Sequence, residues 1–208
     1  MNKPKLTPRS KPQQARSRSR VEHILDVTEK LVLEQGFDAI TTNLVASESG
    51  VPVGTLYHYY SNKFAIFAAV VRRSFGELEQ KWAEQPPDDP DKESVGEYFD
   101  RMLDMMADHW RQRRAAMQLM SSLQHTPEMK PVADRYLKIT SERNAATIAH
   151  YFPDLPKERC QMIGVAMEEA GNALLNRLNG YRGKRRERFK EEMKGMIRAY
   201  LGTIPDSS

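Results

Sequence analysis

The sequence predicts an all-α protein in which an N-terminal three-helix helix-turn-helix domain is joined by a connecting helix to a larger helical bundle. Three observations support this fold class. Apolar residues recur with helical spacing along most of the 208 residues, and no segment alternates as a strand would. Proline and glycine interrupt that spacing and mark helix boundaries. Two short helical segments flank Gly50, as in a helix-turn-helix.

Composition narrows the class of protein. Hydrophobic residues make up 39% and charged residues 29%, which is typical of a soluble globular chain. The single cysteine, Cys160, excludes a disulfide within the chain, and no paired Cys/His cluster suggests zinc. We therefore expect no metal and no cofactor. No run approaches 18 apolar residues and the basic start lacks an apolar stretch, so we expect a cytoplasmic protein without a membrane partner.

Positive charge is concentrated at the N-terminus. Residues 1–20 carry seven Lys and Arg and no acid, although the net charge of the whole chain is only +4. Residues 1–19 are also rich in Pro, Ser and Gln, so we expect a disordered basic arm. Two interpretations stay open: a solubilising tail, or an arm that becomes ordered on DNA phosphates. Residues 205–208 are expected to form a short tail.

The first helix follows the arm. Its apolar stripe has helical spacing and consists of Ile24, Leu25, Thr28, Leu31 and Val32. Gly36 comes directly after this stripe, where a glycine in the left-handed conformation commonly ends a helix. The pattern therefore predicts a helix that ends just before Gly36.

Two short helices come next. Thr41 or Thr42 offers an N-cap hydroxyl for a helix over residues 43–49, and Gly50 permits the positive φ of a tight turn. Pro52 is tolerated at the start of a third helix, over residues 53–60. A small core between these helices is expected from Val45, Val51, Leu56 and Tyr59, and Ala46 is small where the two helices must cross closely.

A longer connecting helix leads into the bundle. Ser61 or Asn62 caps this helix, and the prolines of residues 85–91 end it. Its apolar residues are Phe64, Phe67, Val70, Val71 and Phe75. Further helices are expected over residues 92–109, 111–124, 127–151, 156–180 and 184–203.

Residues 20–67 resemble the DNA-binding region of the TetR family of bacterial regulators. The matching pieces are Ile24-Leu25-Asp26, Gly36-Phe37, Thr41-Thr42, Val45-Ala46, Gly50-Val51, Gly54-Thr55-Leu56-Tyr57, Tyr59-Tyr60 and Asn62-Lys63. Two positions depart from the family pattern. Pro52 replaces the usual capping residue of the third helix, and Phe64 replaces a common acidic residue. Neither change blocks the motif, since Pro52 can fix φ at the helix start and Phe64 can pack on the connecting helix.

The resemblance implies a set of DNA contacts, although each of these residues can also be solvated or pack between helices. Thr42 and Lys63 stand at helix N-termini, which favour phosphate, and Tyr57 and Tyr59 offer hydroxyls. Base edges would be reached from Asn43, Val53, Gly54, Thr55 and His58. Residues 21–63 carry a net charge of −4, so we expect positive charge from the arm, through Arg16, Arg18 and Arg20, to support binding.

The last two predicted helices have the features of an interface. The first contains several small residues, and the second carries an apolar stripe. Such a stripe is commonly internal core, but the resemblance implies that both helices pair with those of a second subunit. Two recognition helices one DNA turn apart also require a two-fold homodimer. The predicted interface residues are Met162, Glu169, Met193, Met196, Ile197 and Tyr200.

Methionine is abundant in the bundle, where flexible thioethers either fill the core or line an adaptable cavity. The candidate pocket for a hydrophobic effector consists of Met102, Met106, Trp110, Met117, Met120 and Met167. Residues 182–190 carry six basic groups against one acid. Two interpretations of this segment stay open, a solvated loop or a site for an acidic partner face or an anionic ligand.

The resulting domain organisation places the DNA-binding domain at residues 20–65 and the ligand-binding and dimerisation domain at residues 66–204. The expected function is a sequence-specific transcriptional regulator, a repressor released from a palindromic operator on double-stranded DNA by a small effector. The alternative is an architectural DNA-binding protein without an effector. The sequence holds no catalytic motif, neither a nucleophile elbow nor a glycine-rich phosphate loop, so we do not expect an enzyme.

Overall fold

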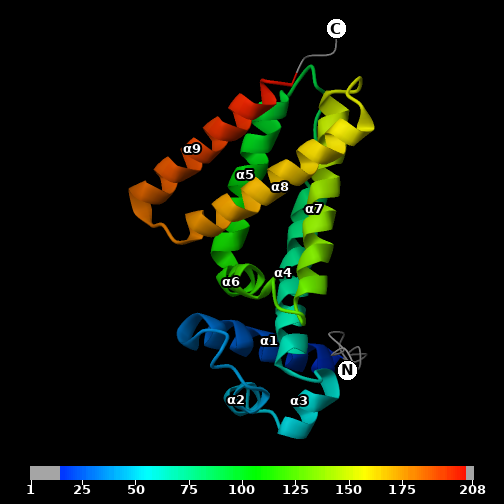
Figure 1. The fold of residues 1–208 in the computed structure, drawn as a ribbon. Coiled ribbons are helices and arrows are strands. Elements are labelled where there is room, and N and C mark those ends of the chain that lie inside the picture. Colours follow the sequence, from blue (N-terminus) through cyan, green and yellow to red (C-terminus); the bar gives the residue numbers. More distant parts are fainter. Residues whose placement is uncertain (1–14, 205–208) are drawn as a thin grey trace. The chain divides into compact units, whose positions relative to one another are not determined.

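The computed structural model describes residues 15–204, and within that range the chain forms helices and no strand (Figure 1). The helices are α1 (Ala15–Gln35), α2 (Thr42–Glu48), α3 (Val53–Tyr59), α4 (Lys63–Ala83), α5 (Val95–Gln112), α6 (Arg114–Leu123), α7 (Lys130–Tyr151), α8 (Lys157–Asn179) and α9 (Gly183–Leu201). The all-α fold predicted from periodicity is therefore confirmed. The tail at residues 205–208 and the first 14 residues of the predicted arm lie outside the described residues.

The described residues form two compact units. Unit 1 consists of residues 15–77 and 113–133, and unit 2 of residues 78–112 and 134–204. The end of α4 from residue 78 and most of α7 thus belong to unit 2, while α6 belongs to unit 1. These packing units do not follow the division at residue 65, which was drawn from the extent of a motif. That division stays a prediction about function.

The helix ends of unit 1 follow local signals. Gly36 and Gly50 have φ of +77° and +62°, so both adopt the left-handed conformation that their positions after α1 and α2 require. Thr41, rather than Thr42, caps α2, because its side chain accepts a hydrogen bond from the Leu44 amide. Asn62 caps α4 in the same way by accepting from the Ala65 amide at 2.9 Å. The helices α1, α2 and α3 lie together (Figure 1), and α1 also contacts α6.

The start of α1 differs from expectation. The helix begins at Ala15, so residues 15–19 are helical although they were assigned to the disordered arm. Arginine has a high helix propensity and no proline occurs in this stretch, so the helix extends beyond its apolar stripe. Arg18 and Arg20 are therefore held on an exposed helical surface.

Unit 2 is built around α5, which contacts both α8 and α9 (Figure 1). The start of α5 is set by a capping box. Ser94 Oγ accepts from the Glu97 amide at 3.3 Å, while Glu97 Oε2 accepts from the Ser94 amide at 2.8 Å. This pair explains why α5 begins at Val95 and not at residue 92. The helices α7 and α8 come close together at Gly164, which faces the backbone of Ser141 and Ala145.

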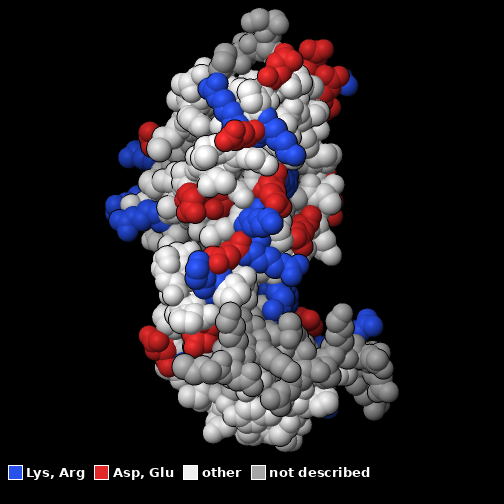
Figure 2. All heavy atoms as spheres, turned by 45° about the vertical axis from the view of Figure 1, so that its right-hand side comes forward, with Lys and Arg blue, Asp and Glu red and all other residues white. Residues whose placement is uncertain are grey.

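The surface of unit 2 carries both signs of charge. Figure 2 shows Lys and Arg side chains interspersed with Asp and Glu over the visible face. Several of them are paired, as when Asp104 of α5 contacts Lys190 at 3.0 Å and Lys194 at 2.7 Å on α9. None of the helices in the described part of the chain has the length and apolar character needed to span a bilayer.

Candidate nucleic-acid interface

A buried core fixes α2 against α3. Val45, Ala46 and Leu56 are fully buried, and the turn between the helices is closed by the Val51 amide, which donates to the Ala46 carbonyl at 3.1 Å. Val51 itself is only half-buried, so it contributes less to the core than expected. The positive φ of Gly50 completes the turn. The second helix of the motif therefore projects from a packed support.

One face of α3 is open to solvent. Val53 and Tyr57 are each 40% exposed. Gly54 is exposed with open space around its Cα, His58 is exposed, and Thr55 is half-buried. As expected from Pro52, the helix has no side-chain cap, and the Pro52 carbonyl accepts from the Thr55 amide at 2.8 Å. These predicted base-contact residues are thus accessible together on one short helix.

The polar residues around this face contact one another. Thr42 Oγ1 and the Tyr57 hydroxyl share a hydrogen bond of 3.0 Å, which joins the start of α2 to the second half of α3. Asn43 is exposed beside Thr42. Lys63 Nζ donates to the Asp38 carbonyl at 3.5 Å and lies 5.8 Å from the Phe64 ring centroid. Thr42, Tyr57 and Lys63 are therefore oriented by neighbours while still reachable from solvent.

Tyr59 is a correction to the predicted set. Its side chain is 6% exposed, and its hydroxyl shares a hydrogen bond of 2.7 Å with Ser17 Oγ of α1. Since 3.6 residues make one helical turn, Tyr59 points about 160° away from Tyr57 around α3. Tyr59 thus belongs to the core of unit 1 and does not present its hydroxyl to a phosphate.

The basic residues at the start of α1 are accessible. Arg18 and Arg20 are exposed, and neither forms an ion pair with another described residue. The side chain of Arg16 and the residues before Ala15 lie outside the described residues. A role for all three arginines at phosphates stays a prediction.

An ion-pair network that was not predicted from the sequence pairs several of the acids in residues 21–63 with arginines. Arg73 of α4 contacts Glu22 at 2.9 Å, Asp26 at 2.8 Å and Glu29 at 2.7 Å, all on α1. Arg113 pairs with Glu77 and, at 3.4 Å, with the same Glu29. Three of the acids that give residues 21–63 a negative net charge are therefore matched by arginines outside that segment. The spacing of Glu22, Asp26 and Glu29 places these acids on one helical face, and this pattern was the sequence signal for a shared basic partner.

The predicted interface residues of α8 and α9 are mostly accessible in the single chain. Met162 is 67% exposed, Met196 59% and Tyr200 42%. Glu169 is also exposed and Ile197 is half-buried. Met193 is a correction, because it is 1% exposed and packs inside unit 2, where it is not available to a partner.

The predicted pocket residues are buried or half-buried, but they are distributed over both units. Met102 and Trp110 are buried in unit 2, where Met106 and Met167 are half-buried. Met117 and Met120 are buried in unit 1. That the six residues line one cavity stays a prediction.

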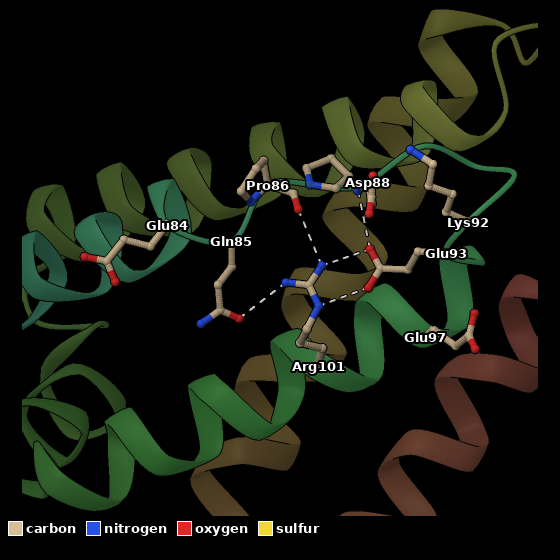
Figure 3. A pocket seen from close by; sticks show the side chains of 9 residues that line it. Glu84, Gln85, Pro86, Asp88, Lys92, Glu93, Glu97 and Arg101 are labelled. Carbon is tan, nitrogen blue, oxygen red and sulfur yellow. Dashed lines mark hydrogen bonds and ion pairs between the residues drawn. The ribbon is translucent and has the colours of Figure 1, made fainter.

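A groove of about 580 Å³ in unit 2 contains none of these six residues. Its lining, shown in Figure 3, comes from residues 84–88 after α4, from Lys92 and Glu93 before α5, and from Glu97 and Arg101 of α5. Arg101 crosses the groove and donates from Nε and Nη2 to Glu93 at 3.0 and 2.9 Å. This pairing lowers the pKa of the Glu93 carboxyl below its usual range. The groove is highly charged, which does not suit a hydrophobic effector.

Comparison with known proteins agrees with this geometry. Residues 24–70 match the family model "Bacterial regulatory proteins, tetR family". Residues 94–201 match the model "Tetracyclin repressor-like, C-terminal domain". The two matches together include the helix-turn-helix and most of the helices that follow it.

Two named relatives are similar over part of the chain. The repressor KstR of Mycobacterium tuberculosis is 33% identical over 64 residues, which cover 31% of this chain and 29% of KstR. The repressor NemR of Escherichia coli is 30% identical over 82 residues, 39% of each chain. The matched segments thus span only about a third of the relatives' length.

Solved structures share the fold over nearly the whole chain. A TetR-family regulator from Syntrophomonas wolfei has a TM-score of 0.70 at 13% identity and covers 92% of this chain and 99% of its own. A regulator of the same class from Aquifex aeolicus has a TM-score of 0.68 at 12% identity, covering 87% and 99%. The multidrug binding protein EbrR, solved with imidazole, has a TM-score of 0.64 at 18% identity, covering 91% and 97%.

Proposed function

Because the chain belongs to the TetR family of bacterial regulatory proteins, we propose that it is a dimeric repressor that binds a palindromic operator and is released by a small effector. The main support for this proposal is the open face of α3, where Val53, Gly54 and Tyr57 are exposed while the core between α2 and α3 is packed. This arrangement suits entry of the N-terminal part of α3 into the major groove.

The contacts divide by chemistry. Val53 and the Thr55 methyl suit the thymine methyl group, and Gly54 lets the helix backbone approach the bases. Tyr57, Thr42 and Lys63 suit phosphate oxygens on either side of the groove. Arg18 and Arg20, which have no ion pair within the described chain, add phosphate contacts from the start of α1.

A homodimer follows from the proposed operator, because two copies of α3 must reach successive major grooves. The exposed Met162, Val165, Met196 and Tyr200 on the adjacent helices α8 and α9 support this surface as the interface. Large apolar side chains gathered on two neighbouring helices are typical of a covered face. An effector would act by shifting the population between states that differ in DNA affinity.

The first test is selection of bound sequences from random duplex DNA by the purified full chain. An enriched palindrome with half-sites about one helical turn apart supports the proposal. Salt-sensitive retention without any sequence preference would instead favour an architectural protein. A small molecule that weakens binding to the selected palindrome then establishes the effector response.

A pair of tyrosine variants tests which face of α3 meets DNA. Tyr57→Phe removes a phosphate-facing hydroxyl and should weaken operator binding roughly 3- to 10-fold, about 1 kcal/mol. Tyr59→Phe is the matched control, since its hydroxyl is bound to Ser17 in the core, and it should change affinity less than twofold. Equal losses in both variants would show that the loss comes from altered packing of α3.

A charge variant tests the start of α1. Replacing both Arg18 and Arg20 with Gln should reduce the slope of log affinity against log salt by roughly 0.9 per lost phosphate contact. The control is Lys30→Gln, which removes an exposed cation that pairs with Glu34. An unchanged slope in the double variant would exclude these arginines as phosphate contacts.

A further inference from the structure

Arg143 of α7 is a part-buried cation whose contacts within unit 2 are all with neutral groups. Its Nη2 donates to the Tyr98 hydroxyl at 2.6 Å and lies 3.5 Å from the Met102 sulfur. Its guanidinium carbon stands 4.8 Å from the Trp82 ring centroid and 5.8 Å from that of Tyr98. The side chain is therefore enclosed by two aromatic rings and a thioether, with no carboxylate of the described chain in contact.

Three other arginines with restricted exposure pair with carboxylates, whereas the buried Arg186 donates to the Ala107 carbonyl at 2.9 Å. Arg73 faces three carboxylates and Arg113 faces two. Arg101 lies 5.2 Å from the Tyr98 ring centroid. Its guanidinium is held by both oxygens of Glu93 (Figure 3). Arg143 has no such partner. Taking a cation out of water without an opposite charge is unfavourable, and burial accordingly lowers the pKa of Arg143.

Not all hydrogen-bond donors of Arg143 are used within the described chain. Only Nη2 of the guanidinium makes hydrogen bonds with the described chain, which leaves Nε and Nη1 free. These two nitrogens are not sealed from solvent, whereas the Trp82 indole N–H is buried without a hydrogen-bond partner. A guanidinium with two free nitrogens matches the two oxygens of a carboxylate. The adjoining rings and thioether suit an apolar body.

The geometry points to Arg143 as the anchor for a small organic carboxylate with an apolar body, the chemical class of the effector. This inference rests on the proposed effector response and adds the charge of the ligand. A cationic ligand would be repelled by Arg143. A neutral ligand would leave the guanidinium without an opposite charge, so it gains only the apolar contacts.

The test uses two sets of isosteric probes, each with one carboxylate, one alcohol and one ammonium. The sets are 1-naphthoate, 1-naphthalenemethanol and 1-naphthylmethylammonium, and octanoate, octanol and octylammonium. Binding to the full-length protein is measured by isothermal titration calorimetry. At least one carboxylate should bind tenfold or more tightly than its alcohol, and the ammonium more weakly than either.

Two substitutions separate charge from folding. Arg143→Met keeps an apolar chain and should reduce carboxylate affinity at least tenfold while leaving alcohol affinity within twofold. It should also keep the thermal midpoint of the wild type or raise it, because an unmatched charge is removed. Arg143→Lys retains the cation and should keep most of the preference for carboxylate over alcohol.

The outcomes distinguish this inference from the proposed function. Absence of carboxylate binding in both sets, equal affinity for alcohol and carboxylate, or full carboxylate affinity in Arg143→Met would overturn it. Release of operator DNA is measured separately with the same probes. Carboxylate binding through Arg143 without DNA release would remove the proposed effector response and leave the binding site standing. DNA release by an alcohol alone would support an effector response and overturn Arg143 as the anchor of the effector.

Discussion

Gly164 is the position at which a single methyl group should be most disruptive. A Cβ placed on Gly164 of α8 would lie 2.8 Å from the Ala145 amide nitrogen and 3.0 Å from its Cβ on α7, and closer still to the Ser141 carbonyl oxygen. Ordinary contact begins at 3.4 Å, so α7 and α8 must separate by at least 0.6 Å at this crossing. Both nearest atoms belong to backbone, which cannot move aside as a side chain would.

The size of the effect follows from that separation. A gap of 0.5–1 Å forfeits about a quarter to a half of the dispersion energy of the atoms that line it, and overpacked cores lose roughly 1–3 kcal/mol. The Gly→Ala change in a helix interior returns up to about 1 kcal/mol through propensity. We therefore expect Gly164→Ala to lower the free energy of unfolding by about 2 kcal/mol, and a larger loss for Gly164→Val.

The assay is urea unfolding followed by far-ultraviolet circular dichroism at one fixed protein concentration, because dimerisation links stability to concentration. A slope of about 2 kcal/mol per molar urea places the midpoint of Gly164→Ala about 1 M below wild type. Gly76→Ala in α4 is the matched control, since nothing lies within 4 Å of its added Cβ, and it should be neutral or stabilising. A Gly164→Ala protein as stable as Gly76→Ala would refute the close crossing of α7 and α8.

Three further predictions test other contacts. Arg73→Gln should lower the unfolding free energy by about 2–3 kcal/mol, because Glu22 and Asp26 lose their arginine partner and Glu29 keeps only Arg113. Urea unfolding of both proteins is the check, and equal unfolding free energies would contradict this. Burial raises the pKa of the Glu168 carboxyl from 4.5 to about 7. Between these two pH values the folded protein binds a proton that the unfolded chain releases, so the stability of the protein should fall as pH rises from about 4.5 to 7. Glu168→Gln should remove that fall and be more stable than wild type at pH 8 by on the order of 1–2 kcal/mol. This is less than the full pKa shift implies, because the carboxyl keeps some water. Parallel profiles of stability against pH for the two proteins would contradict the prediction. Gly171→Ala in α8 meets nothing within 4 Å in the single chain, so a weaker dimer by analytical ultracentrifugation would place a partner helix at that residue, and an unchanged dimer would exclude it.

Local signals in the sequence were sufficient for the helices and for most of their ends. The positive φ of Gly36 and Gly50 and the caps at Thr41 and Asn62 each depend on residues within one turn of the position concerned. The proline-rich stretch at residues 85–91 ends α4 for the same reason. The helix-turn-helix and the family could be recognised because the motif is a run of such local requirements in a fixed order.

Local signals were insufficient wherever a role depends on which side of a helix is covered. Tyr57 and Tyr59 are both aromatic and lie two residues apart in α3, yet one is exposed and the other is buried against Ser17 of α1. Met193 and Met196 lie on one apolar stripe of α9, yet only Met196 is open to a partner. The stripe is wide enough to serve core and interface together, so its pattern does not divide them.

By itself, the sequence determined that the chain is all-α, where its helices begin and end within a few residues, and that its N-terminal part is a helix-turn-helix. Only the tertiary structure decided that Arg73 is matched by three carboxylates 44 to 51 residues away while Arg143 meets none. Helix formation depends on hydrogen bonds and side chains within four residues, which the sequence lists in order. The partner of a buried charge depends on how whole helices cross, and side-chain packing over the entire unit sets that crossing.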